Sequence, residues 1–293
     1  MYDIKALYEA TSVANAIELL IAHPEALIIA GGSDVLVQMR EGRLANRELV
    51  SIFKLDELRG VSMDDDGTIR ILPLSNFSTI TNHPIIQKYI NVLGEAVDMV
   101  GGPQIRNIAT IGGNTCNGVT SADSASTLFA WDAIMEMTGP NGVRQLPISE
   151  FYVGPGKVAL EHAELLTAIL IKKESYEGYA GHYIKYAMRN AMDIATTGCS
   201  VNVKLSPDKK MIENVRIAYG VAGPMPRRTN TAEELIKNKP IEMEHISAFA
   251  KAALTDVNPR TSWRATKEFR LHLVEELANR ALIEAIKRSG GVI

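Results

Sequence analysis

Two short segments of the chain place consecutive glycines beside polar residues, and they are the best candidates for ligand binding. The first is Gly31-Gly32-Ser33-Asp34 and the second is Thr110-Ile111-Gly112-Gly113-Asn114. Glycine permits a positive φ angle and a close approach of the backbone to a ligand. Successive backbone N–H groups in such a turn form a concave anion site that suits a phosphate. One such turn alone is more often a plain tight turn, but two of them predict a site for a pyrophosphate, as in a dinucleotide.

The better known nucleotide and catalytic motifs are absent from the sequence. No G-x-G-x-x-G opens a helix, and residues 154–158 (GPGKV) have valine where a phosphate loop has serine or threonine. Residues 154–158 are more typical of a turn before a strand. The six histidines lack metal-ligand spacing, and no G-x-S-x-G nucleophile turn occurs. The two cysteines, Cys116 and Cys199, are too few for an iron–sulfur cluster, which commonly takes four. We therefore predict no metal site in this chain and name no catalytic acid or base.

Three further residues allow two interpretations each. Asp123 lies in a turn and could cap a helix or hold a ligand. Lys185 has aromatic and apolar neighbours and could be a surface lysine whose stem packs on them. Cys116 is more typical of a small buried residue than of a nucleophile, although it lies close to the second Gly-Gly pair.

Strands and helices alternate irregularly around these segments, which indicates α+β layers. We expect a first helix from Val13 to Ile21, capped by Thr11 or Ser12, and a helix over 85–100 that ends at Gly101-Gly102-Pro103. A helix is expected at 124–131, and the chain from residue 231 onward is predicted to be helical. Expected strands are 26–30, 49–53, 68–72, a hairpin of 133–137 with 143–146, 164–172, 182–188, 197–205 and 215–221.

Length and charge limit the classes of partner. A chain of 293 residues allows about two domains. The 34 acidic and 31 basic residues leave a net charge of −3, which gives no basic footprint for nucleic acid. No apolar run reaches the roughly 20 residues that span a bilayer, and the first residues lack a signal-peptide core. We therefore predict a cytoplasmic protein that binds neither nucleic acid nor membrane.

The same segments resemble one protein family. Residues 29–36 (IAGGSDVL) are similar to the first FAD loop of the molybdenum hydroxylase flavoproteins, and residues 102–114 (GPQIRNIATIGGN) are similar to the second. The likeness continues through residues 121–124 (SADS), 185–189 (KYAMR) and 261–270 (TSWRATKEFR), and so covers nearly the whole chain. Residues 154–158 and 185–194 and the Trp263 segment most resemble the FAD-binding subunits of bacterial xanthine dehydrogenases.

The resemblance implies the fold and the division of the chain. It implies an α+β protein with a two-lobed FAD-binding domain of the vanillyl-alcohol-oxidase type, over residues 1–176 with subdomains of about 1–56 and 57–176. A small C-terminal domain of one sheet and helices would follow over 177–293, after the polar stretch that begins at Lys173.

The resemblance also implies a split enzyme. A large partner subunit would carry the molybdenum cofactor and hydroxylate a purine, and a small partner would carry two [2Fe–2S] clusters. This chain would carry FAD, collect electrons from the clusters and pass a hydride to NAD⁺. The low cysteine count agrees with clusters held only in a partner.

By the same resemblance, the FAD pyrophosphate would be wrapped by the first loop, consisting of Leu27, Ile28, Ile29, Ala30, Gly31, Gly32, Ser33 and Asp34. The second loop would add contacts from Ala109, Thr110, Ile111, Gly112, Gly113 and Asn114. Asp123 matches a carboxylate that holds FAD, Leu166 an apolar contact, and Lys185 a lysine near the flavin ring, where a cation favours reduced flavin. Val100 stands where relatives can place an aromatic residue, which leaves open what packs on the flavin ring.

Three alternatives stay open at this point. The chain could serve another molybdenum hydroxylase, acting on a nicotinate-like or aldehyde substrate. It could be a self-sufficient flavin oxidase, although the part after about Lys185 is small for a substrate domain. It could also be an assembly protein that has lost FAD, which the intact glycines disfavour. The sequence does not determine the substrate, the electron acceptor or the oligomeric state.

Overall fold

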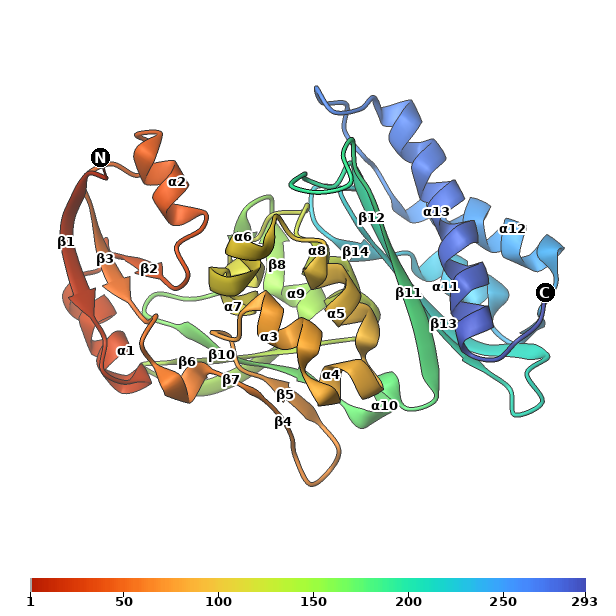
Figure 1. Ribbon diagram of the computed structural model, residues 1–293, viewed down its shortest axis with the longest axis horizontal. Coiled ribbons are helices and arrows are strands. Elements are labelled where there is room, and N and C mark those ends of the chain that lie inside the picture. Colours follow the sequence, from red (N-terminus) through yellow and green to blue (C-terminus); the bar gives the residue numbers. More distant parts are fainter. Residues whose placement is uncertain (1) are drawn as a thin grey trace.

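The chain forms three main sheets, each covered by helices, that follow one another along the sequence (Figure 1). The computed structural model describes residues 2–293. The first lobe is a parallel sheet in the order β1-β3-β2, made of β1 (Ile4–Glu9), β2 (Leu27–Ile29) and β3 (Arg47–Ser51). Helix α1 (Val13–Ala22) joins β1 to β2, and helix α2 (Val35–Arg40) lies between β2 and β3. The first Gly-Gly segment therefore lies at the carboxyl end of a parallel strand.

The second lobe is a five-stranded antiparallel sheet whose middle connection contains six helices. The strand order is β4-β5-β10-β6-β7, with β4 (Val61–Met63), β5 (Ile69–Ile71), β6 (Ile134–Gly139), β7 (Gly142–Pro147) and β10 (Leu165–Ile171). Between β5 and β6 lie α3 (Phe77–Asn82), α4 (Pro84–Tyr89), α5 (Asn91–Asp98), α6 (Pro103–Ile108), α7 (Ile111–Cys116) and α8 (Asp123–Ala130). Shorter elements are η1 (Asp56–Leu58), α9 (Ile148–Phe151), β8 (Tyr152–Gly154), β9 (Lys157–Val158) and α10 (Lys173–Tyr176).

The C-terminal part is an antiparallel sheet between two layers of helix. Its long strands are β11 (Tyr179–Tyr186), β12 (Thr197–Leu205) and β13 (Met211–Gly220), and the short strands β14 (Arg227–Arg228) and β15 (Lys239–Pro240) pair with β13. Helices α11 (Asn230–Ile236), α12 (Met243–Ala252) and α13 (Lys267–Arg288) follow, with η2 (Ala253–Asp256) between the last two. Helix α13 packs on β11 and β12, while α8 of the second lobe packs on β12 and β13 (Figure 1). This explains why β12 is buried along nearly its whole length.

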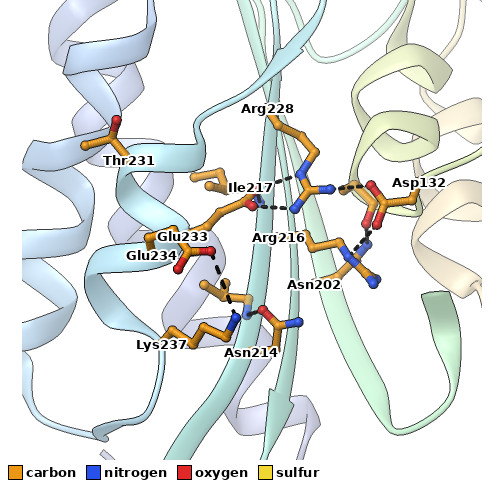
Figure 2. Close-up of polar contacts among 12 residues, drawn as sticks. Asp132, Asn202, Asn214, Arg216, Ile217, Arg228, Thr231, Glu233, Glu234 and Lys237 are labelled. Carbon is orange, nitrogen blue, oxygen red and sulfur yellow. Dashed lines mark hydrogen bonds and ion pairs between the residues drawn. The ribbon is translucent and has the colours of Figure 1, made fainter. Parts of the chain in front are cut away.

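An ion network fastens the second lobe to the C-terminal sheet just beyond α8 (Figure 2). Asp132 accepts from Arg216 Nε at 2.8 Å and also pairs with Arg228. Glu233 pairs with Arg228 and accepts from the backbone N–H of Ile217 at 2.9 Å. Because two cations face two carboxylates, the network is neutral, which stabilises its buried members, Arg216 and Glu233.

Most expected elements occur, and the α+β class with two lobes followed by a small sheet-plus-helices domain is confirmed. Ser12 caps α1 by accepting from the backbone N–H of Asn15. The predicted turn at residues 154–158 joins β8 to β9. Strand β1 and helix α2 were not expected, because neither has a clear periodic pattern. We propose that the boundary between the FAD-binding domain and the C-terminal domain lies between residues 176 and 177. The end of helix α10 at Tyr176 supports this boundary.

Three local predictions are wrong. Residues 85–100 form two helices, α4 and α5, because the chain leaves helical geometry at the fully buried Ile90. The chain after residue 231 is not continuously helical, since β15 and an extended segment around 257–266 interrupt it. The second Gly-Gly segment is not a turn after an extended segment but the first turn of α7, directly after helix α6.

Candidate functional site

A cavity of about 420 Å³ lies between the first and second lobes. The two Gly-Gly segments form facing parts of its wall, so the structure brings together the two strongest sequence candidates. Of the residues predicted to bind a cofactor, those lining this cavity are Leu27, Ile28, Ala30, Gly31, Gly32, Ser33, Asp34, Val100, Ala109, Thr110, Gly112, Gly113, Asn114 and Leu166. Ile29 and Ile111 are not among its lining residues, and Ile111 is fully buried in the core of the second lobe.

The first Gly-Gly segment needs both glycines. A Cβ on Gly31 would lie 1.9 Å from the carbonyl oxygen of Ile108, so this glycine lets the first lobe touch the end of α6. Gly32 has a φ of +71°, in the left-handed region that favours glycine. Within residues 2–293, the backbone N–H groups of Gly32, Ser33 and Asp34 have no hydrogen-bond partner. Adjacent free N–H groups suit the oxygens of a phosphate, as the sequence predicts for this segment.

The second segment differs because its N–H groups are already used. Ile111 and Gly112 donate to the carbonyl oxygens of Ser75 and Pro73 at 3.0 and 2.8 Å. Gly113 donates to the Thr110 hydroxyl, the N-cap of α7, at 3.2 Å. A Cβ on Gly112 would lie 2.3 Å from the Pro73 Cβ, so this glycine is needed for packing. The expectation of a second anion-binding turn is therefore wrong, although the segment still forms cavity wall.

A second cavity, of about 250 Å³, adjoins the first and shares Val100 and Asn114 with it. Its wall also contains Asp123 and Lys185, so these two predicted residues lie beside the other candidates. The opposite wall comes from residues 192–194, in the connection between β11 and β12, which sequence reasoning missed. The Asn114 side-chain oxygen accepts from the Ser124 hydroxyl at 2.6 Å, which orients the amide.

Asp123 and Lys185 form a buried ion pair across the domain boundary. The Lys185 ammonium donates to one Asp123 carboxylate oxygen at 2.7 Å and to the Met99 carbonyl oxygen at 2.9 Å. The Tyr183 hydroxyl donates to the other Asp123 oxygen at 2.7 Å. Both side chains of the pair are less than a tenth exposed. Lys185 is therefore not a surface lysine. Asp123 does not cap a helix, because it is the first residue of α8 and the capping position is occupied by Ala122.

Burial and hydrogen bonding act in opposite directions on Asp123. Burial raises the pKa of its carboxyl, while the Lys185 ammonium and the Tyr183 hydroxyl oppose the rise. Burial also raises the pKa of the Tyr183 hydroxyl well above its usual value, so this group stays protonated and donates. Tyr183 was missed from the sequence, although residues two apart on a strand share a face, which places it beside Lys185.

Cys116 lines the first cavity, where burial raises the pKa of its thiol to about 12 and keeps it neutral. A neutral, buried thiol is typical of a packing residue and not of a nucleophile.

In the described part of the chain, no three His, Cys, Asp or Glu side chains gather closely enough to hold a metal ion. Among the same residues, no helix combines the length and apolar character needed to cross a bilayer.

The two cavities fit an extended ligand that carries a phosphate group and a planar ring. The unpaired N–H groups of the first segment meet the need of a phosphate, and the apolar residues around Leu166 and Val100 meet that of an aromatic group. The Lys185 ammonium adds one positive charge to the wall of the second cavity. FAD has this combination of groups.

Comparison with known proteins points in the same direction. Residues 2–172 match the model described as the FAD binding domain in molybdopterin dehydrogenase, and residues 182–285 match the CO dehydrogenase flavoprotein C-terminal domain. The chain is 42% identical, over 99% of both sequences, to the xanthine dehydrogenase FAD-binding subunit of Escherichia coli O157:H7. It is 32% identical, over 75% of both, to the nicotinate dehydrogenase FAD-subunit of Eubacterium barkeri.

Among solved structures, the fold matches a chain of carbon monoxide dehydrogenase from Hydrogenophaga pseudoflava. The TM-score is 0.93 at 27% sequence identity, with 98% of this chain and 99% of that chain covered. The match extends over both lobes and the C-terminal sheet and helices.

Proposed function

Since the chain belongs to the family of molybdenum hydroxylase FAD-binding subunits, we propose that it is the flavin subunit of a xanthine dehydrogenase complex. A small partner with two [2Fe–2S] clusters would deliver electrons, and a large partner with the molybdenum cofactor would hydroxylate the purine. The electron acceptor would be NAD⁺, and the complex would work in the cytoplasm. The observation that carries the proposal is the full-length likeness to the xanthine dehydrogenase subunit, together with two adjoining cavities lined by the matching residues.

Within this proposal, the first cavity holds the phosphates and the second holds the flavin ring. When bound, FAD supplies the redox chemistry, taking up single electrons and giving up a hydride. The free N–H groups of Gly32, Ser33 and Asp34 would bind phosphate oxygens. The other residues of the site would be the remaining predicted residues that line the two cavities, namely Leu27, Ile28, Ala30, Gly31, Val100, Ala109, Thr110, Gly112, Gly113, Asn114, Asp123, Leu166 and Lys185.

The Asp123–Lys185 pair would tune the site electrostatically. Asp123 and the Met99 carbonyl hold the Lys185 ammonium in place at the cavity wall. A cation fixed there favours negative charge that develops on the bound ring system. No side chain of the site is given the role of a catalytic acid or base, because the chain's task is to bind and orient.

The proposal is tested first by filling the cavity with a side chain. A Cβ on Gly113 would meet Thr110 Oγ1 at 3.0 Å and Ala30 Cβ at 4.0 Å, so a long side chain there would extend into the cavity. We expect Gly113→Arg to abolish FAD binding and Gly154→Arg, at the end of β8, to leave about one FAD per chain. The measurement is the flavin absorbance of the purified complex, with circular dichroism to check folding. A folded Gly113→Arg variant with a full complement of FAD would contradict the site.

The acceptor is tested separately. NADH added without oxygen to the complex should remove the flavin absorbance if NAD⁺ is the acceptor. Reduction by dithionite but not by NADH would show that another acceptor is used, without affecting the assignment of the FAD site.

A second candidate function is the flavin subunit of a nicotinate-type molybdenum hydroxylase. The 32% identity to the nicotinate dehydrogenase FAD-subunit favours it, although over a shorter part of the chain. The assembled complex should be offered xanthine, hypoxanthine and nicotinate in turn. Turnover of nicotinate alone would decide for this second candidate.

A further inference from the structure

Large apolar side chains are exposed beside the second cavity, and two of them, Met192 and Ile194, line it. We call them the rim surface: Tyr186, Met188, Met192, Ile194, Trp263 and Phe269. Each is at least 40% exposed, and Trp263 reaches 77%. Single exposed apolar residues are ordinary, but a connected group of this size marks an interaction site.

The rim surface is continuous although its residues come from two segments. The first segment is the β11–β12 connection, whose residues 192–194 line the second cavity. The second runs from Trp263, before α13, to Phe269 in the first turn of α13, and Figure 1 shows the β11–β12 connection and the start of α13 at the same end of the C-terminal sheet. The rings of Tyr186 and Phe269 lie 5.8 Å apart. Arg270 links the segments by donating to the Thr196 carbonyl oxygen at 3.0 Å and the Ser262 hydroxyl at 2.9 Å.

Trp263 is presented by a short, braced turn. Ser262 and Ala265 pair across the turn, with Trp263 and Arg264 at its tip. The Arg264 guanidinium lies 4.1 Å from the centre of the Trp263 indole, which holds the ring by a cation–π contact. An exposed indole that is already fixed loses little conformational entropy on binding, which makes it a suitable anchor for a partner.

The same surface carries positive charge that the chain does not neutralise. Burial lowers the pKa of Arg270, and the positive charges of Arg260 and Arg264 lower it further. Among residues 2–293, neither Arg260 nor Arg264 forms an ion pair with a carboxylate, and the Arg264 guanidinium lies over the Trp263 ring instead. The only acid on the β11–β12 connection, Asp193, is already paired with Arg189. A binding partner would therefore have to supply the missing negative charge.

We propose that the rim surface is the docking site of the iron–sulfur partner, through a face with an apolar centre bordered by carboxylates. The inference rests on the proposed function and adds the surface of this chain that the iron–sulfur partner contacts. Tryptophan, tyrosine, phenylalanine, methionine and arginine are the residues enriched at the centre of protein interfaces, which favours a protein over a nucleotide. Electron transfer slows steeply with distance, so the electron donor must dock beside the second cavity, where Lys185 lies.

The test uses the complete complex, diluted stepwise and followed by native mass spectrometry. We expect Trp263→Ala to weaken retention of the iron–sulfur subunit by roughly 30-fold, the size of effect typical of an interface anchor. The double variant Arg260→Glu with Arg264→Glu should weaken retention as well, and should remove its sensitivity to salt. Val143→Ala, an exposed residue on β7, and Arg280→Glu, an exposed residue farther along α13, serve as controls and should retain the subunit.

FAD content and NADH oxidation are measured on the same samples. Unchanged retention in both rim variants overturns the docking proposal. It is also overturned if only the molybdenum subunit leaves, or if assembly is unchanged and only NADH oxidation falls, which would make the rim a nucleotide site. A wild-type complex without FAD would contradict the proposed function instead, so the two failures are distinguishable.

Discussion

Helix α8 has a carboxylate at each end, and both carboxylates tie the second lobe to the C-terminal sheet. At the N-terminal end, Asp123 pairs with Lys185 of β11. Just beyond the C-terminal end, Asp132 pairs with Arg216 of β13 and Arg228 of β14. The two networks use the same kinds of group at the same domain boundary, yet only the first lies beside the predicted cofactor residues.

The networks differ in how many of the hydrogen-bond donors of their cations have an acceptor. Arg228 donates from three nitrogens to Asp132 and Glu233, which clamps its planar guanidinium between two carboxylates (Figure 2). The Lys185 ammonium has three protons but two acceptors, Asp123 and the Met99 carbonyl, and it faces a cavity. Both networks border a cavity, since Asp132 and Arg228 line one of about 370 Å³, so the difference lies in the spare donor. A fully engaged network holds domains together, whereas a cation with a donor to spare can act on a ligand. Three substitutions test this difference.

The largest effect is expected from Glu233→Ala at the fully engaged end. Glu233 is almost completely buried and accepts from Arg228 and from the Ile217 backbone, so its loss leaves a charge and an N–H unpaired. We expect the free energy of unfolding to fall by about 3 kcal/mol. Denaturant titration measures this, with FAD content per folded chain unchanged. Glu234→Ala, an exposed residue on the same helix, should cost less than ~0.5 kcal/mol. Equal losses in both variants would contradict a structural clamp.

An intermediate effect is expected from Lys185→Met at the N-terminal end of α8, and it concerns the flavin midpoint potential more than stability. Asp123 would lose its cation and keep the hydrogen bond from Tyr183, and its pKa would rise further. While the carboxyl stays ionised, the site carries one positive charge less, which should lower the flavin midpoint potential by about 30 mV, equivalent to ~1.4 kcal/mol for two electrons. Lys173→Met, at an exposed position on α10, is the control. An unchanged potential in Lys185→Met would place the lysine outside the electrostatic reach of the flavin.

The smallest effect is expected from Tyr183→Phe. The substitution removes one hydrogen bond to Asp123 and keeps both the ring and Lys185, so it should cost about 1 kcal/mol of stability. Because this hydroxyl lowers the pKa of Asp123, its loss should raise that pKa, as carbon NMR of the carboxyl would reveal. Tyr186→Phe removes the hydroxyl of an exposed ring and should change neither quantity. A shift of the flavin midpoint potential as large as that of Lys185→Met would mean that Tyr183 acts on the ligand directly.

Features governed by neighbouring residues could be predicted from the sequence. The cap of α1, the hairpin of β6 and β7 and the turn after β8 depend on side chains and glycines within a few positions of one another. The first Gly-Gly segment also followed from local chemistry, because Gly32 needs a positive φ and a strand precedes it. The family likeness added the residues of the site, and the cavities contain nearly all of them.

Features that depend on distant contacts could not be predicted in this way. Residues 111–116 contain two glycines and make a poor helix in isolation, and α7 forms because Thr110 caps it and Gly112 packs on Pro73. The break at Ile90 lies in an apolar stretch with no local breaker, where burial of Ile90 outweighs helical continuity. In both places tertiary packing overrides the local preference.

The sequence by itself determined the α+β class, most strand positions and the first Gly-Gly turn, because these depend on short-range geometry and residue type. The candidate site residues came from the family likeness of the same sequence. Only the tertiary structure decided that the second Gly-Gly segment is helical, that Asp123 meets Lys185, and that two similar carboxylates at the ends of α8 have different surroundings. The physical reason is that burial, charge pairing and the presence of a cavity depend on which distant segments meet, and no local pattern in the chain encodes that meeting.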